Sequence, residues 1–237
     1  MLKQIFTAIA LLAVTSPALA GKISVRPLGA VLAPNETVTS FTITNLDTKP
    51  VRLQMQGFAW VKEPVCKQVE VEQTNDKDGE HPSKLETVCT DTPETSDIKF
   101  GPSLVEIQPG KEQVVRLGRV VPFAGPEMHY RAQITEIPAE LKDEPQEQGA
   151  KIILPIAYNV GVFWRETTAS ANVAVSWVSN GLELRNNGTA TAKVLAPNDK
   201  GAMGLLGYVL PGQTKVFPYT KSQGSLTLNI NGQLQQF

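Results

Sequence analysis

Short segments in which apolar and polar residues alternate recur along most of the chain after residue 20. The clearest are 38–45, 51–60, 113–117, 130–137 and 152–162. A period of two is typical of a β-strand with one buried face, whereas no segment keeps the longer period of an amphipathic helix. Turn residues separate the segments at intervals typical of antiparallel sandwiches. The pattern therefore predicts an all-β protein.

Two pairs of similar stretches predict two domains of the same type. Residues 41–45 (FTITN) resemble 182–186 (LELRN), and residues 107–114 resemble 209–216, each with a Pro-Gly turn at the same place. A long apolar segment ends near 165–169. We therefore expect a first domain over 21–166 and a smaller second domain over 167–237.

Composition and charge restrict the class of function. The chain carries 22 Lys and Arg against 23 Asp and Glu, which is not the basic excess of a nucleic-acid binder. Its two His and two Cys are too few for a zinc cluster, and no glycine-rich phosphate loop is present. His129 lies near Glu127 but is not accompanied by a nucleophile motif. We therefore expect no nucleic-acid partner, metal or cofactor, and no enzyme activity.

The first twenty residues have the features of an export signal. Lys3 precedes an apolar run over residues 5–14, and Ala18-Leu19-Ala20 is a small-x-small cleavage pattern. The run is shorter than the roughly 20 residues that span a bilayer. Cleavage after Ala20 is therefore favoured over retention as a short membrane anchor. We expect an exported protein without a stable membrane anchor, in an oxidising compartment.

In such a compartment, Cys66 and Cys89 are expected to form a disulfide. Closing a loop of this size stabilises the fold by roughly 3 kcal/mol on the chain-entropy model. The surrounding residues 63–97 hold ten Asp and Glu against three Lys. This composition indicates a solvated insertion in the first domain, clipped by the disulfide. The alternative, a carboxylate metal loop, is disfavoured because the acids lack the spacing of a calcium loop.

The segment 151–165 is long for a strand of a sandwich. Pro155 falls on one face and suits a sheet edge, where no amide donor is needed. The opposite face carries a row of large side chains: Ile152, Leu154, Ile156, Tyr158 and Val160. Periodicity leaves two interpretations of this row open. It packs in the protein's own core, or it lies on an exposed edge that pairs with another chain.

At this point the sequence resembles the PapD-like periplasmic pilus chaperones of the chaperone-usher pathway. The ordered set that carries the resemblance is Ala30-Val31-Leu32, 42–45, 115–117 after a Pro-Gly turn, Glu136-Ile137-Pro138, the long alternating segment, and Phe163-Trp164-Arg165. The resemblance implies two immunoglobulin-like β-sandwich domains in an L or boomerang, with a cleft between them.

The same resemblance implies a binding function in the periplasm. Such chaperones insert alternating side chains of one strand into a pilus subunit that lacks a strand, and deliver it to an outer-membrane usher. By position, the donor residues are Ile152, Leu154 and Ile156, with Tyr158 and Val160 extending the set. Whether the free protein caps this edge by dimerising stays open. The alternative, a structural pilus subunit or adhesin, is disfavoured because Pro27 and Gly29 interrupt its N-terminal segment.

One departure from the family concerns the anchor for the subunit's C-terminal carboxylate. The better-known branch uses an Arg and a Lys, but the aligned positions here hold Gly29 and Gly161. A divergence of this kind is similar to the archaic branch. A buried carboxylate needs a charged partner, so another basic residue should replace the pair.

The first candidate for this anchor is Arg131, because a hairpin loop centred near residue 144 would place it opposite Tyr158. Arg116 is the second candidate, followed by Arg26 and Arg165. For each of the four, the alternative is a structural role, such as a salt bridge to Glu136 or a cap on a sheet edge.

Overall fold

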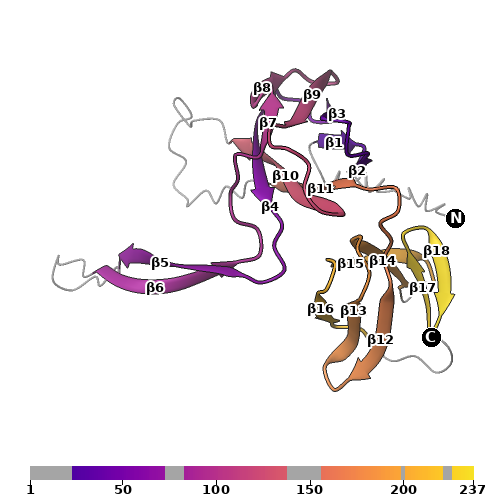
Figure 1. Cartoon of the computed structure of the whole chain (residues 1–237). Helices are drawn as coiled ribbons and strands as arrows, with labels where there is room; N and C mark the ends of the chain where they lie inside the picture. The colour runs from indigo at the N-terminus through magenta and orange to yellow at the C-terminus, as the bar shows by residue number, and fades with distance from the viewer. Residues whose placement is uncertain (1–22, 73–82, 138–155, 199–200, 221–225) are drawn as a thin grey trace, which may run out of the picture.

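The computed structural model describes residues 23–72, 83–137, 156–198, 201–220 and 226–237. These residues form eighteen β-strands and no helix, so no helix among them could cross a membrane. Apart from a separate hairpin over residues 65–90, the strands fall into two lobes joined after residue 165 (Figure 1). The prediction of an all-β fold with two β-sandwich domains is confirmed.

The first domain is built from two facing sheets. One has the strand order β1-β3-β9-β7 and the other the order β2-β11-β10-β4-β8. Their bounds are β1 Ile23–Arg26, β2 Gly29–Leu32, β3 Val38–Asn45, β4 Val51–Ala59, β7 Ile98–Gly101, β8 Leu104–Ile107, β9 Glu112–Arg119, β10 Glu127–Ile137 and β11 Ala157–Arg165.

Alternation along these strands sends one set of side chains into the space between the two sheets. Phe41 and Ile43 of β3, Leu53 of β4, and Val162 and Trp164 of β11 are all buried there. Burying side chains of this size contributes about 1.5–3 kcal/mol each relative to exposure. The alternating segments expected from the sequence thus form strands because their apolar face closes this core.

The second domain has the same construction with fewer strands. Its sheets have the orders β12-β13-β16 and β15-β14-β17-β18, around a separate core that includes Leu182, Val194 and Leu228. The strand bounds are β12 Val173–Val178, β13 Gly181–Asn186, β14 Ala192–Pro197, β15 Met203–Val209, β16 Thr214–Phe217, β17 Thr227–Ile230 and β18 Gln233–Gln236.

The internal repeat corresponds to one buried asparagine in each domain. Asn45 ends β3 and donates from Nδ2 to the carbonyl oxygens of Lys49 and Ile107. Asn186 ends β13 and donates in the same way to those of Ala190 and Val209. The backbone oxygen of each asparagine also accepts from the glycine of the matching Pro-Gly turn. The two domains therefore share the same arrangement of asparagine hydrogen bonds at equivalent corners.

The acidic insertion forms a separate two-stranded hairpin, β5 (Val65–Glu72) with β6 (Ser83–Thr90). The predicted disulfide is confirmed: Cys66 and Cys89 face each other across the hairpin and are bonded. Figure 1 shows the hairpin projecting from the end of β4, away from both domains. Residues 65–90 are called the hairpin arm below.

Candidate functional site

The row of large side chains on β11 passes from the core to the surface. Trp164, Val162 and Val160 are buried in the first domain, and Tyr158 is half-buried against the same core. Ile156, the next residue of the row, is 39% exposed. Ile152 and Leu154 lie outside the described residues. The row therefore leaves the core between positions 158 and 156.

This placement separates the five predicted donor residues into two groups. Val160 is 1% exposed and fills the protein's own core, so its side chain does not face a guest. Tyr158 is held by its hydroxyl, which donates to the backbone oxygen of Ile23 at 3.2 Å. Ile156 is the described member of the row that presents an apolar side chain to solvent.

One edge of β11 lacks a partner strand where the row emerges. Antiparallel pairing with β10 runs from Ala157 to Arg165, but parallel pairing with β2 covers only Gly161–Trp164. Within the described residues, Ala157–Val160 therefore has no strand on its second side. Backbone groups on such an edge are available to an added strand.

The two glycines aligned with the family's anchor are direct neighbours across the sheet, since Gly161 pairs with Gly29. A Cβ at 161 would lie 2.9 Å from Cε2 of Phe163 and 3.8 Å from the Trp60 ring. A longer side chain at 161 would thus require the Phe163 ring to shift.

Arg131 of β10 is the cross-strand neighbour of Gly161 on its other side, so Gly29, Gly161 and Arg131 lie side by side across the sheet. The prediction that it lies opposite Tyr158 is wrong, because Tyr158 pairs with Ile134. The expected partner of Arg131 is displaced by three residues, because the sequence placed the centre of the loop between the two strands near residue 144. Pairing of Arg131 with Gly161 moves the guanidinium closer to the cleft than expected.

The Arg131 guanidinium lies over the Trp60 ring, 3.9 Å from its centroid. Burial lowers the pKa of Arg131 from its ordinary value, while the charge of Asp91 and the neighbouring Tyr208 hydroxyl act in the opposite direction. Arginine stays protonated at any physiological pH, so the site holds a partly desolvated cation. A cation of this kind interacts more strongly with an incoming anion than one in water.

Two of the other three candidate arginines lie away from the cleft, whereas Arg165 lines a pocket between the two domains. Arg116 is exposed on β9 and Arg26 on β1, both in the sheet that does not contain β11. Arg165 lies at the domain junction, where its Nε donates to Glu127 Oε2 at 2.5 Å. Arg165 also donates to the Thr191 carbonyl oxygen at 3.2 Å.

The junction is held by polar and aromatic contacts. Glu127, buried on β10, accepts from the backbone nitrogen of Thr191 at 2.8 Å and from its hydroxyl. Beside it, Trp60, Phe163 and Tyr208 pack together, with ring centroids 5.2–6.1 Å apart. Burial lowers the pKa of His129, so its imidazole is neutral at this junction at pH 7. Residues of both domains therefore meet in direct contact at the junction.

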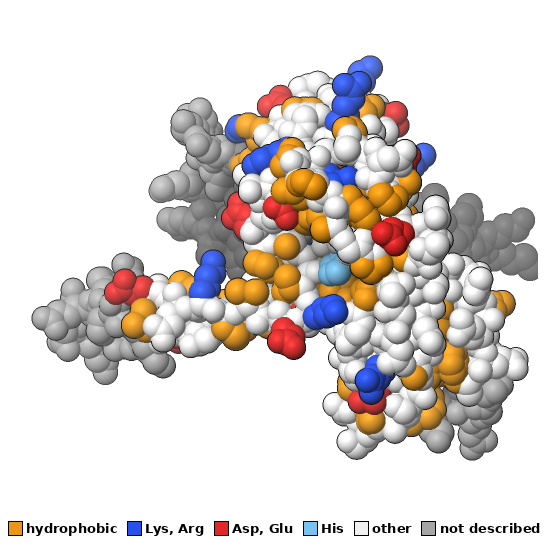
Figure 2. Space-filling view, viewed as in Figure 1, with side chains coloured by type: hydrophobic (Ala, Val, Ile, Leu, Met, Phe, Trp, Pro, Cys, Tyr) orange, Lys and Arg blue, Asp and Glu red, His pale blue; other side chains and the backbone are white. Residues whose placement is uncertain are grey.

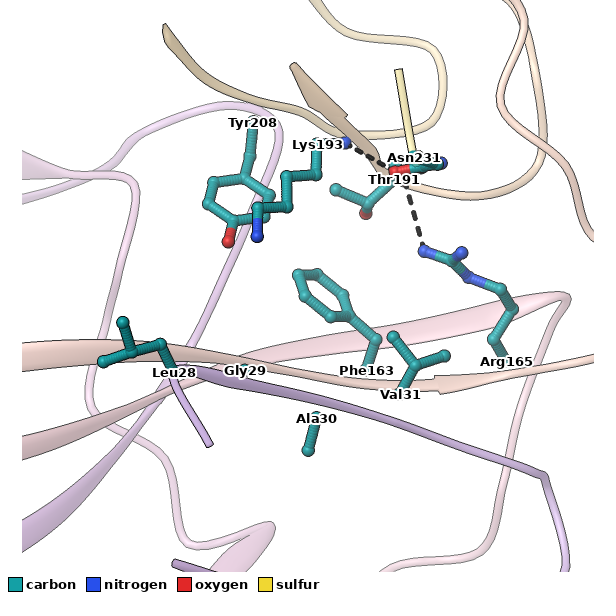
Figure 3. Close-up of a pocket in the computed structure, with 10 residues that line it drawn as sticks. All are labelled: Leu28, Gly29, Ala30, Val31, Phe163, Arg165, Thr191, Lys193, Tyr208 and Asn231. Carbon is teal, nitrogen blue, oxygen red and sulfur yellow. Dashed lines mark hydrogen bonds between the residues drawn. The ribbon is translucent and has the colours of Figure 1, made fainter. Parts of the chain in front are cut away.

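A pocket of about 450 Å³ lies in this cleft (Figure 3). Gly29 and Phe163 contribute from the first domain, and Tyr208 and Lys193 from the second. The Lys193 side chain extends into the pocket beside Tyr208, its partner in the β14–β15 pairing. Sequence reasoning missed Lys193, because nothing local relates a lysine in the second domain to β11.

Comparisons with known proteins agree with this architecture. Residues 23–169 match the family described as the pili and flagellar-assembly chaperone, PapD N-terminal domain. The comparison with curated proteins gave no match.

Several solved structures share the fold. The chain is 14% identical, with a TM-score of 0.61, to the Salmonella enterica SafA pilin in complex with the SafB chaperone, over 91% of this chain and 95% of the other. It is 20% identical, with a TM-score of 0.54, to the CsuC-CsuE chaperone-tip adhesion subunit complex from archaic Csu pili of Acinetobacter baumannii, over 87% and 93%. It is 12% identical, with a TM-score of 0.57, to the E. coli chaperone DraB, over 91% of this chain and 94% of the other.

These likenesses cover both domains, and the family match covers the whole first domain, including the open edge of β11. The interpretation as a structural pilus subunit is not favoured by them. The chain belongs to the pili and flagellar-assembly chaperone family.

Proposed function

We propose that this protein is a periplasmic chaperone that holds pilus subunits by donor-strand complementation and passes them to an outer-membrane usher. One observation carries the proposal: the apolar row of β11 leaves the core at Ile156, where the strand also has an open edge. A subunit that lacks a strand would gain backbone pairing from this edge and side chains for its groove.

The side chains proposed to enter the subunit are Ile152, Leu154 and Ile156. Each large aliphatic side chain buried in a guest contributes on the order of 2 kcal/mol. At Tyr158 the side chains of the row stop facing the proposed guest and begin to pack in the chaperone's own core, because the Tyr158 ring packs against that core.

The proposal is tested by placing a charge in the row. Ile156→Asp is expected to lower recovery of the cognate subunit on the tagged chaperone by about thirty-fold or more, because about 2 kcal/mol of apolar burial is lost. Co-expression followed by affinity purification measures this recovery. The control is Asn159→Asp, which puts the same charge at an exposed position on the opposite face of β11. Equal recovery with both variants would refute donor-strand binding.

Arg131 is the proposed partner of the subunit's C-terminal carboxylate. It pairs with Gly161, is half-buried, and is a neighbour of the cleft residue Tyr208. The pocket that Tyr208 lines holds two further cations, Arg165 from the first domain and Lys193 from the second. A carboxylate in this cleft would thus have basic residues from both domains around it.

Arg131→Gln is expected to weaken subunit binding by about tenfold to a hundredfold, the equivalent of one charge-assisted contact of about 1.5–3 kcal/mol. Competition between tagged wild type and variant for a limiting subunit measures the ratio. Arg116→Gln, exposed on the other sheet, is the control. If Arg131→Gln competes as well as that control, the carboxylate is anchored elsewhere.

Export follows from the family, whose pilus chaperones act in the periplasm. We propose cleavage after Ala20, which lies outside the described residues. The disulfide of the hairpin arm is in keeping with an oxidising compartment.

A further inference from the structure

The hairpin arm is a sheet of its own, since β5 and β6 pair only with each other among the described strands. An isolated two-stranded hairpin is marginally stable in water. Here the bond between Cys66 and Cys89 joins the two strands near their base. A disulfide that orders an otherwise marginal element pre-organises it, which lowers the entropy cost of binding.

The register puts apolar side chains on one face of the arm. Val65, Val69 and Val88 lie on this face together with Lys67, Glu86 and Thr90. Val65 is 49% and Val88 46% exposed. Figure 2 shows apolar surface along the arm, interspersed with charged side chains. We call this the valine face.

The arm differs in charge from the rest of the protein. Residues 65–90 hold six acidic residues and three lysines, which leaves 17 acidic and 19 basic residues elsewhere in the chain. On the valine face itself the described charged residues are Lys67 and Glu86, so this face suits a partner surface with an apolar centre and charges of both signs around it.

The arm begins close to the proposed anchor for the subunit. Trp60, the ring under Arg131, is followed within five residues by β5. The base of the arm is closed by a hydrogen bond from the Val61 nitrogen to the Asp91 oxygen, 2.9 Å long. A guest whose C-terminus reaches Arg131 therefore comes within reach of the arm.

We propose that the valine face of the hairpin arm is a second contact surface for the pilus subunit, recognising an apolar patch edged by charges of both signs. The proposal rests on the proposed chaperone function. The continuity of the arm with the Trp60–Arg131 contact favours the subunit over other occupants. Its expected effect is on the affinity and selectivity for subunits, because β11 alone completes the subunit's sandwich.

The test is competition in the periplasm between differently tagged wild type and variant for a limiting cognate subunit. Val65→Ser with Val88→Ser is expected to reduce the variant's share about tenfold, as the loss of two partly buried valines implies. Val38→Ser, an equally exposed valine of β3, is the control and should compete equally. Thermal melting of each variant verifies folding.

A second variant removes the arm. Replacing residues 63–89 by Asn-Gly, a two-residue hairpin turn, keeps the Val61–Asp91 hydrogen bond at the base and should reproduce the loss. Equal competition by both arm variants would overturn the proposal. The proposal is also overturned if both variants compete equally for the subunit but surface fibres are lost, which would assign the arm to the usher. It is overturned as well if both variants compete equally but a wild-type dimer becomes monomeric. Ile156→Asp separates these outcomes from failure of the chaperone function, because it removes subunit binding whatever the arm does.

Discussion

Replacing Glu127 by Ala should lower the free energy of unfolding by about 3–5 kcal/mol, the range measured when one partner of a buried ion pair is removed. The Glu127 side chain is fully buried and its carboxylate binds Arg165 at 2.5 Å. It also accepts the Thr191 backbone N–H, at 2.8 Å, and the Thr191 hydroxyl. In the variant the Arg165 guanidinium keeps its bond to the Thr191 oxygen but loses its counter-charge.

The loss should be concentrated at the domain junction, because Glu127 is on β10 and Thr191 directly precedes β14. Each domain has its own core, so partial separation of the domains is expected before either core unfolds. Urea unfolding gives the change in stability, and small-angle scattering gives the change in domain arrangement.

Two variants control this prediction. Glu127→Gln keeps an oxygen that accepts from Thr191 but removes the charge that faces Arg165, and should lie between wild type and alanine. Glu166→Gln, at an exposed acid beside Arg165 in sequence, should be nearly neutral. An alanine variant as stable as Glu166→Gln would show that the junction does not depend on this carboxylate.

Asn186→Ala should destabilise the second domain by about 3 kcal/mol or more. Its Nδ2 donates to Ala190 and Val209, and its Oδ1 accepts from the backbone nitrogens of Gly188 and Asn172. Alanine leaves these groups buried without a partner, and one unsatisfied buried group costs about 1–3 kcal/mol. Urea titration followed by Trp fluorescence measures the midpoint.

The neighbouring asparagine provides the control. Asn187 is exposed, so Asn187→Ala should change stability by less than about 0.5 kcal/mol. Asn45→Ala should reproduce the large effect in the first domain, since Asn45 makes the equivalent bonds to Lys49, Ile107 and Asp47. If Asn186→Ala unfolded at the same urea concentration as Asn187→Ala, the asparagine would not hold the corner together.

Much of the candidate site was visible in the sequence. The parity of the apolar row is correct, because Tyr158, Val160, Val162 and Trp164 do share one face. Alternation could not reveal where along the row the core ends, since buried and partner-facing residues have the same pattern. Val160 therefore entered the expected donor set although it lies in the core.

For the carboxylate anchor, the sequence identified a candidate residue but not its position in the sheet. Arg131 was singled out from the sequence, but its position opposite Gly161 depends on the register of β10 and β11. Register is set by hydrogen bonds across the sheet and by the geometry of the connecting loop, which residue types alone do not specify. The same reasoning explains why the Trp60 contact under Arg131 was not foreseen.

By itself the sequence determined the β class, the internal repeat that contains Asn45 and Asn186, and the pairing of Cys66 with Cys89, because these depend on periods and residue types that can be read along the chain. Only the tertiary structure decided which surface faces the cleft. Glu127 meets Thr191 across 64 residues, and Lys193 lines a pocket to which both domains contribute. Such contacts arise from the packing of one domain on the other, a long-range arrangement that leaves no local pattern in the chain.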